Sequence, residues 1–215
     1  MVNRDPVEYQ EPHSHPRLVV ESLLENPVEQ FKIWFQEAES AGVPEPNIMT
    51  LATVNKRVQP SLRVVLMKEI TDQGIVFYTN FRSRKAREMD QHPRAALNFF
   101  WYLLNRQVRL EGDITKVPDH KSDAYFKTRP RGSQLGAWVS EQSEAIPSRE
   151  FLEKELSNYQ TRFEGQDIPR PPHWGGYLLT PHRVEFGKLV RIGCTIGFNI
   201  PSARATGSVA GWRLN

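Results

Sequence analysis

Three adjacent residues have the types and the position needed to bind a phosphate group: Ser83, Arg84 and Lys85. They follow a predicted strand and open a predicted helix, for which Ser83 is a favourable N-cap residue. Free backbone N–H groups and the positive end of the helix dipole would point at an anion there. Arg84 and Lys85 add positive charge to a first turn that usually favours Asp or Glu. The sequence therefore predicts a phosphate site, with a solvated basic turn as the alternative interpretation.

Two further cations, Arg63 and Lys68, lie in the predicted strand 61–68 upstream of this helix. Because side chains alternate between the two faces of a strand, Arg63 and Lys68 should serve different surfaces unless a bulge intervenes. One of them could meet a cofactor while the other meets something beside it. The predicted strand 105–115 also has one polar face, where Gln107 could be exposed to water or could face a polar ligand.

These residues are positioned by a predicted hairpin, with its turn at 71–74, and by helices inserted between short strands. Six or more strands, several of them in consecutive hairpins, predict a mainly β fold with α insertions, arranged as a small antiparallel barrel. The predicted strands include 47–54, 61–68, 95–102 and 105–115, and the predicted helices are 27–41, 83–90, 118–126, 134–139 and 148–163.

The helix 148–163 is strongly charged and begins at Ser148 with a capping-box pattern. We expect it to carry no chemistry. Its packing side chains are expected to be Phe151, Leu152, Leu156 and Tyr159.

Composition narrows the class of protein. The chain has 215 residues, 39% of them hydrophobic, which suits one globular domain with a sizeable core. A single cysteine, Cys194, forbids an internal disulfide and a cysteine-based zinc cluster, and the histidines are scattered, so we expect no metal. No apolar run is long enough to cross a bilayer, and the first residues lack a signal sequence. A cytoplasmic protein is predicted, with mitochondrial import left open.

Nucleotide-binding and hydrolase motifs are missing from the sequence. No GxGxxG or GxxxxGK[ST] follows a predicted strand, and no GxSxG elbow or Cys/His pair suggests a nucleophile. The net charge of +3 favours anionic ligands, and a phosphate-bearing small molecule fits the dispersed Lys and Arg at least as well as nucleic acid does.

Four long runs carry a resemblance to a known family: FYTNFRSRKA at 77–86, NRQVRLEG at 105–112, YFKTRPRGSQLGAWVSEQS at 125–143, and HWGGYLLTPHRVEF ending at Phe186. With them the chain resembles the pyridoxine (pyridoxamine) 5'-phosphate oxidases, flavin enzymes that make pyridoxal 5'-phosphate. The resemblance covers roughly residues 27 to 186. It implies an FMN-binding split β-barrel domain at 26–186, followed by an atypical tail at 187–215. Proline, histidine and charged residues dominate 1–25, which we expect to form a flexible arm.

The resemblance further implies a homodimer with FMN bound at the subunit interface, and no nucleic-acid or membrane partner. Gln142 and Ser143 would reach FMN across that interface. The residues expected to bind FMN are Arg63, Val64, Val65, Leu66, Tyr78, Thr79, Arg84, Lys85, Gln107, Gln142 and Ser143. The residues expected to bind the phosphate of the vitamin B6 substrate are Lys68, Tyr125, Arg129 and Ser133.

In such enzymes the chemistry is largely that of the flavin, so no catalytic side chain is assigned. A hydride passes from the carbon bearing the alcohol or amine to FMN, and dioxygen reoxidises the flavin and yields hydrogen peroxide. The protein aligns the two rings, because transfer requires near contact.

The sequence departs from the family at Gly187. Family members continue after Glu-Phe with Trp-Gln-Gly-Gln-Thr-Asn-Arg-Leu-His-Asp-Arg, of which the Trp and the last Arg contact FMN and the Arg-Leu-His group covers the substrate. Here the chain reads GKLVRIGCTIG, and no Trp, His or Asp follows until Trp212. The genetic code offers an explanation. If a T nucleotide stands before the codon of Gly187, the codons that follow can be read in a shifted frame. That frame permits the family residues named above at every position except the third and the fourth. We infer a frameshifted reading of the family tail as a hypothesis.

The substituted tail is expected to form a poor strand, because Gly187, Gly193, Gly197 and Pro201 interrupt it. A chain made as written should dimerise, bind FMN weakly and turn over substrate poorly. Two other classes stay open. One is a protein on the same barrel that binds FMN or pyridoxal phosphate without catalysis, and the other is a remote nucleic-acid binder.

Overall fold

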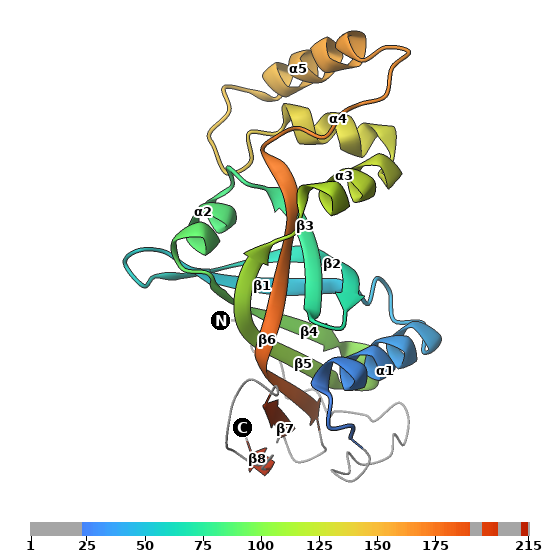
Figure 1. Ribbon diagram of the computed structural model, residues 1–215, viewed down its shortest axis with the longest axis vertical. Coiled ribbons are helices and arrows are strands. Elements are labelled where there is room, and N and C mark those ends of the chain that lie inside the picture. Colours follow the sequence, from blue (N-terminus) through green and yellow to red (C-terminus); the bar gives the residue numbers. More distant parts are fainter. Residues whose placement is uncertain (1–22, 190–194, 202–211, 215) are drawn as a thin grey trace, which may run out of the picture. The chain divides into compact units, whose positions relative to one another are not determined.

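The computed structural model describes residues 23–189, 195–201 and 212–214, in which groups of consecutive strands are separated by helices (Figure 1). Every predicted helix and strand is present there, with its ends shifted by at most three residues. The elements are α1 (Pro27–Ser40), β1 (Ile48–Val54), β2 (Pro60–Thr71), β3 (Gly74–Asn80), α2 (Arg84–Gln91), β4 (Arg94–Trp101), η2 (Tyr102–Leu104), β5 (Arg106–Lys116), α3 (Asp119–Thr128), α4 (Arg131–Val139), α5 (Arg149–Arg162), β6 (Trp174–Leu189), β7 (Thr195–Pro201) and β8 (Trp212–Leu214).

The strands form one sheet that closes on itself. Their order is β3-β2-β1-β4-β5-β6-β7-β8, and an additional pairing joins β3 to β6. That pairing is antiparallel and runs from Ile75 opposite Leu179 to Asn80 opposite Trp174. Six strands, β1 to β6, therefore make an antiparallel barrel, which confirms the predicted fold class. Closure leaves no free edge between β3 and β6.

The chain divides into two compact units, each described here by itself. One unit holds Met1–Pro46, Asn98–Leu110 and His182–Asn215, and the other holds Asn47–Leu97 and Glu111–Pro181. The second unit therefore contains β1, β2, β3 and α2 to α5. Most of the residues singled out in the sequence belong to it.

The hairpin β2–β3 depends on Thr71 and Gly74. The hydroxyl oxygen of Thr71 accepts hydrogen bonds from the backbone N–H groups of Gln73 and Gly74, each at 3.2 Å. Gly74 has a φ of +146°, and a Cβ atom there would lie 1.9 Å from the carbonyl oxygen of Leu179. Because only glycine fits this close approach, the turn and the β3–β6 pairing are specified together.

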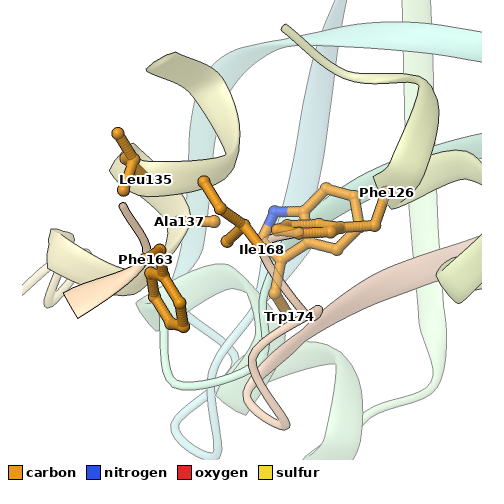
Figure 2. Close-up of a cluster of buried hydrophobic side chains, with 6 residues drawn as sticks. All are labelled: Phe126, Leu135, Ala137, Phe163, Ile168 and Trp174. Atoms are coloured by element: carbon orange, nitrogen blue, oxygen red, sulfur yellow. The ribbon is translucent and has the colours of Figure 1, made fainter. Parts of the chain in front are cut away.

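A cluster of buried apolar side chains holds α3, α4 and the start of β6 together in the second unit (Figure 2). Figure 2 shows Phe126 of α3 beside Trp174 of β6, with Leu135 and Ala137 of α4 nearby. The rings of Phe126 and Trp174 meet edge to face, with centroids 5.2 Å apart. The cluster fixes the helices that carry Tyr125 and Ser133, and with them Arg129, which follows α3 directly.

In the first unit, aromatic side chains attach α1. Phe31 lies 4.9 Å from Phe99 between ring centroids, and Trp34 meets the edge of Phe186 at 5.1 Å. Phe31 and Trp34 are both buried, so this face of α1 belongs to the core of the unit.

The structure corrects two expectations about packing and strands. Phe151 of α5 is exposed, so it does not pack as predicted, whereas Leu156 and Tyr159 do pack against the buried cluster. The strand β6 continues through Gly187 to Leu189, and β7 pairs with it, Gly187 standing opposite Gly197. The expected interruption at these two glycines is wrong, since ladder pairing outweighs their low strand propensity. Gly193 and most of the arm 1–25 lie outside the described residues.

No helix among the described residues is both long and apolar enough to span a membrane.

Candidate functional site

A pocket of about 1020 Å³ opens in the second unit, on residues from β2, β3, the start of α2, α3, α4 and the loop after α4. Its volume is at the upper end of the range for small-molecule sites. It brings together all the residues expected to bind FMN or substrate except Gln107. These are Arg63, Val64, Val65, Leu66, Lys68, Tyr78, Thr79, Arg84, Lys85, Tyr125, Arg129, Ser133, Gln142 and Ser143.

Arg63 is fixed to the barrel wall by hydrogen bonds. Its Nη1 donates to the carbonyl oxygens of Leu51 at 3.1 Å and Ser61 at 3.2 Å, and to Thr53 Oγ1 at 2.5 Å. Its Nη2 donates to Ser61 Oγ at 2.6 Å and to Glu88 Oε2 at 3.3 Å. Burial lowers the pKa of Arg63, and the Glu88 carboxylate opposes that shift. The guanidinium is therefore held with most of its donors in use.

Glu88 lies beneath this corner as a buried carboxylate. It also accepts from Thr53 Oγ1 at 2.5 Å, Ser61 Oγ at 2.8 Å and Arg84 Nε at 2.8 Å. Burial alone would raise its pKa, but the hydrogen bonds from Thr53, Ser61 and Arg84, together with the charge of Arg84, lower that pKa to about 2. Glu88 is therefore ionised throughout the neutral range and binds both arginines.

Lys85 is buried at the start of α2 and points its amine at polar oxygens. Its Nζ donates to Gln142 Oε1 at 2.6 Å, to Thr79 Oγ1 at 3.0 Å and to Ser83 Oγ at 3.3 Å. Ser83 is the N-cap of α2, as predicted, and accepts from the backbone N–H of Ala86. Burial, and then the charge of Arg63, lower the pKa of Lys85 to about 8. The charged amine of Lys85 therefore has neutral hydrogen-bond acceptors, which do not neutralise its charge.

Three aromatic rings form a layered stack on another wall of the pocket. Tyr78 and Trp174 are nearly parallel, with centroids 5.2 Å apart, and Tyr125 lies 4.1 Å from Tyr78. Arg129 places its guanidinium carbon 4.6 Å from the centroid of Trp174, a cation–π contact. Its Nη1 is buried and has no hydrogen-bond partner among the described residues. Burial lowers the pKa of Arg129, and the nearby Tyr125 opposes that shift.

Arg63 and Lys68 line the same pocket, although strand alternation alone would separate them. The register between β2 and β3 shifts between Met67 and Glu69, which marks an irregularity of the kind a β-bulge makes. The shift lies next to Lys68, where a bulge was foreseen as the exception to strict alternation. Side chains from both faces of this strand, Val64 and Val65 among them, line the pocket, so Arg63 and Lys68 share one pocket instead of serving two separate surfaces.

The loop after α4 is joined to β3 within the same chain. Asn80 Nδ2 donates to the carbonyl oxygen of Ser140 at 2.9 Å, and Thr79 Oγ1 donates to Gln142 Oε1 at 3.1 Å. Ser143 follows with a φ of +74°. Gln142 and Ser143 thus line the pocket of their own chain, whereas the resemblance implied that they act across an interface. Ser133 is exposed in the first turn of α4.

Gln107 belongs to the first unit, where its Nε2 donates to Asn98 Oδ1 at 2.7 Å. Its contact with a cofactor stays a prediction.

Comparison with known proteins agrees with this geometry. Residues 35–163 match the family model described as pyridoxamine 5'-phosphate oxidase. A pyridoxine/pyridoxamine 5'-phosphate oxidase of Acaryochloris marina is 54% identical over 161 residues, which are 75% of this chain and 74% of that protein. The enzyme of the same name from Burkholderia thailandensis is 47% identical over 204 residues, 94% of this chain and 93% of that protein.

The chain belongs to the pyridoxine/pyridoxamine 5'-phosphate oxidase family. Solved structures agree with this placement. PhzG from Burkholderia lata, solved with tetrahydrophenazine-1-carboxylic acid, has a TM-score of 0.82 at 25% identity and covers 91% of this chain and 94% of its own. A pyridoxamine 5'-phosphate oxidase-related, FMN-binding protein from Nostoc punctiforme shares the fold, with a TM-score of 0.65 at 17% identity over 88% of this chain and 97% of its own. The barrel is thus the split barrel of this oxidoreductase family.

Two residues of the site were missed from the sequence. Trp174 lies in a motif that carried the resemblance, yet its contact with Arg129 depends on the fold. Glu88 stands four residues after Arg84, a spacing that favours an ion pair on a helix and could have indicated it.

Proposed function

We propose that this chain binds FMN and oxidises pyridoxamine or pyridoxine 5'-phosphate to pyridoxal 5'-phosphate, with dioxygen as acceptor and hydrogen peroxide as product. The observation that carries this proposal is the charge of the pocket. The charged residues that line it, among those described, are the cations Arg63, Lys68, Arg84, Lys85 and Arg129. A cofactor phosphate and a substrate phosphate would together bring about three to four negative charges. The set of donors therefore fits two phosphorylated ligands.

The cations at the start of α2 suit the phosphate of FMN. Arg84 and Lys85 lie in the first turn, where the helix dipole adds to their charge, and Arg63 faces them from β2. Thr79 adds a hydroxyl group from β3. In this proposal the FMN-binding residues are Arg63, Val64, Val65, Leu66, Tyr78, Thr79, Arg84, Lys85, Gln107, Gln142 and Ser143.

The second group of polar residues suits the phosphate of the substrate. Nη1 of Arg129 is buried and has no partner within the ranges that the structure describes, and an isolated donor of this kind costs free energy until an acceptor reaches it. Tyr125 is next to Arg129, and Lys68 and Ser133 line the same pocket. These four residues would bind the phosphate and so orient the vitamin ring.

When bound, FMN supplies the hydride acceptor and passes the electrons to dioxygen. The residues of the chain itself would bind the substrate and the flavin and align them with each other. Lys68 and Arg129 would hold the substrate by its phosphate end, and the backbone and apolar groups of β2 would hold the flavin, since transfer needs the reacting atoms within about 3–3.5 Å. The stack of Tyr78, Tyr125 and Trp174 supplies a rigid wall for this alignment.

The test is to purify the chain, record its visible spectrum and measure oxygen uptake with pyridoxamine 5'-phosphate. We expect a flavin spectrum, release of FMN on denaturation, and oxygen uptake that requires the phosphate, with unphosphorylated pyridoxamine as the control. A colourless protein that takes up no FMN when it is added would refute the proposal.

We further propose that the functional form is a homodimer whose interface covers an apolar strip on β2. Leu62 and Val64 are 69% and 65% exposed, and Leu66 continues the same face. All three line the pocket, so a second copy placed there would cover its open side. Leu62→Glu should give a monomer in sedimentation experiments, whereas Val58→Glu, at an equally exposed position, should leave the dimer intact. A monomeric wild-type chain would contradict this.

A second candidate function is an impaired protein that binds FMN or pyridoxal phosphate without efficient turnover. The observation that favours it is the departure from the family sequence at Gly187, which removes the expected Trp and Arg-Leu-His residues. A flavin spectrum without oxygen uptake would support this candidate, and oxidase activity at the level of relatives would exclude it. Sequencing the transcript across the Phe186 codon tests the frameshift hypothesis, which fails if no shifted family codons follow.

A further inference from the structure

Glu88 is a buried carboxylate to which no role has yet been given. It lies in the second turn of α2, with its side chain 5% exposed. It stands directly behind Arg63 and Arg84, which line the pocket, and it is not among the lining residues that the structure describes. A negative charge next to a site for an anion needs an explanation, because simple electrostatics predicts that it weakens anion binding.

The two oxygens of Glu88 divide their partners between two elements. Oε2 accepts from Arg63 on β2 at 3.3 Å, as well as from the hydroxyl groups of Thr53 and Ser61. Oε1 accepts from Arg84 on α2 at 2.8 Å. One carboxylate therefore links the arginine of the barrel wall to the arginine of the helix.

The two arginines depend on Glu88 to different degrees. Arg63 is also held by the carbonyl oxygens of Leu51 and Ser61, so its place is set by the strands. Arg84 is half exposed, and among the described residues its side chain is bonded only to Glu88. Because Glu88 takes the Nε of Arg84, both Nη groups of Arg84 stay available to a ligand. A free arginine of this exposure would sample many rotamers.

We propose that Glu88 is a positioning residue, which anchors Arg84 through Nε and thereby aims its two Nη groups at the phosphoryl group of FMN beside Arg63. This inference rests on the proposed binding of FMN. In this proposal Glu88 strengthens FMN binding, because a fixed, planar guanidinium matches two oxygens of a phosphate group. This gain in binding free energy exceeds the repulsion between the Glu88 carboxylate and the phosphate. Phosphate binding and Glu88 then act on opposite sides of the same guanidinium.

The test compares the affinities for FMN and for riboflavin, which lacks the phosphate, in the purified full-length chain stripped of flavin. Flavin fluorescence quenching gives both dissociation constants. For Glu88→Gln we expect FMN affinity to fall about 10-fold, in line with the loss of one charge-assisted hydrogen bond, and riboflavin affinity to stay within about 2-fold. Retained riboflavin binding also shows that the variant is folded. Glu88→Asp, which keeps the charge, should fall between Glu88→Gln and wild type.

The chain offers a matched control. Arg149 and Glu153 in α5 have the same i,i+4 geometry, with Nε 2.9 Å from Oε1, but both are exposed. Glu153→Gln should leave both affinities unchanged. A second control is the pair Arg84→Ala and Arg84→Ala/Glu88→Gln: the double variant should bind FMN no more weakly than Arg84→Ala, because Glu88 acts through Arg84.

The outcomes separate the two claims. Unchanged or tighter FMN binding by Glu88→Gln would overturn the positioning role and leave the proposed function standing, because it is the result that charge repulsion alone predicts. Equal losses of FMN and riboflavin would assign Glu88 a merely structural role. A wild-type chain that does not prefer FMN over riboflavin would overturn the proposed function and this inference together.

Discussion

Tyr78 and Tyr125 stack face to face, with ring centroids 4.1 Å apart and planes inclined by 22°. Tyr78 comes from the barrel strand β3 and Tyr125 from the helix α3, so the stack joins the helical segment to the barrel wall. Burial, and then the charge of Glu69 and the neighbouring Tyr125, raise the pKa of Tyr78 to about 12, and burial raises the pKa of Tyr125. Both phenols are therefore neutral hydrogen-bond donors at neutral pH.

The first prediction separates the hydroxyl group of Tyr125 from its ring. Tyr125→Phe keeps the stack and removes the donor, so we expect KM for pyridoxamine 5'-phosphate to rise about 10-fold, with Tm and FMN affinity unchanged. Tyr125→Leu also removes the stack and should lower Tm. Steady-state kinetics and thermal unfolding check both variants. A KM for Tyr125→Phe equal to that of wild type would remove this residue from the substrate site.

The second prediction concerns Arg129, whose Nη1 is buried and has no hydrogen-bond partner in the described part of the chain. Arg129→Met keeps much of the packing on Trp174 and removes an unsatisfied donor, so we expect the ligand-free protein to become more stable, by about 1 kcal/mol. That corresponds to a rise in Tm of roughly 2–4 °C for a chain of this size. Binding of pyridoxal 5'-phosphate, the product, should be lost.

Arg129→Lys is the informative control for this prediction. It keeps the charge but not the planar group that stacks on Trp174 at 4.6 Å, so binding should weaken without the gain in Tm. A lower Tm for Arg129→Met would mean that Arg129 stabilises the fold, and that it does not lower the stability of the ligand-free protein in exchange for ligand binding.

The sequence predicted the elements of the fold well, because their signals are local. The N-cap at Ser83 and the turn at Thr71 to Gly74 are decided by neighbouring residues, and both are present. Phe151 was misplaced, because helical periodicity does not say which neighbour covers an apolar side chain. The strand β7 was unforeseen, because pairing with β6 comes from residues outside the strand itself.

The cations of the site could be predicted from the sequence, but the residues that position these cations could not. The corner at Arg84 and Lys85 follows from helix physics and charge. The role of Glu88 depends on Thr53 and Ser61, which hydrogen bond to it from two different strands. The burial of Arg129 against Trp174 and Phe126 likewise cannot be read from a sequence, since it results from the way the fold packs these side chains together.

The third prediction tests the close contact between β5 and β6 in the second unit. A Cβ atom on Gly112 would lie 2.2 Å from the carbonyl oxygen of Thr180 and 2.8 Å from the Cα of Pro181. Both are backbone atoms, so Gly112→Ala should destabilise the protein by more than about 2 kcal/mol and lower its midpoint in urea. Gly132→Ala in α4 meets nothing within 4 Å and should be neutral or stabilising. Equal stability of the two variants would contradict the packing described here.

The fourth prediction follows from Lys85, whose pKa is lowered from 10.5 to about 8 by burial and then by the charge of Arg63. Below pH 8 the amine is charged and attracts the phosphate of FMN, which is already a dianion above about pH 7. FMN affinity should therefore fall progressively as pH rises through 8. Lys85→Arg stays charged and should flatten this profile, and riboflavin binding should not follow it.

The stability of the ligand-free protein should change in the opposite direction over the same range. Because the pKa of Lys85 is lower in the folded state, the unfolded chain binds more protons between pH 8 and 10.5, and the contribution of this group to stability rises with pH there. Urea titrations of wild type and Lys85→Met at pH 7.5 and 9.5 measure this contribution. We expect Lys85→Met to have the larger free energy of unfolding at pH 7.5, and the difference from wild type should shrink at pH 9.5. If FMN affinity and this stability difference are both independent of pH, Lys85 is not the buried cation of the site.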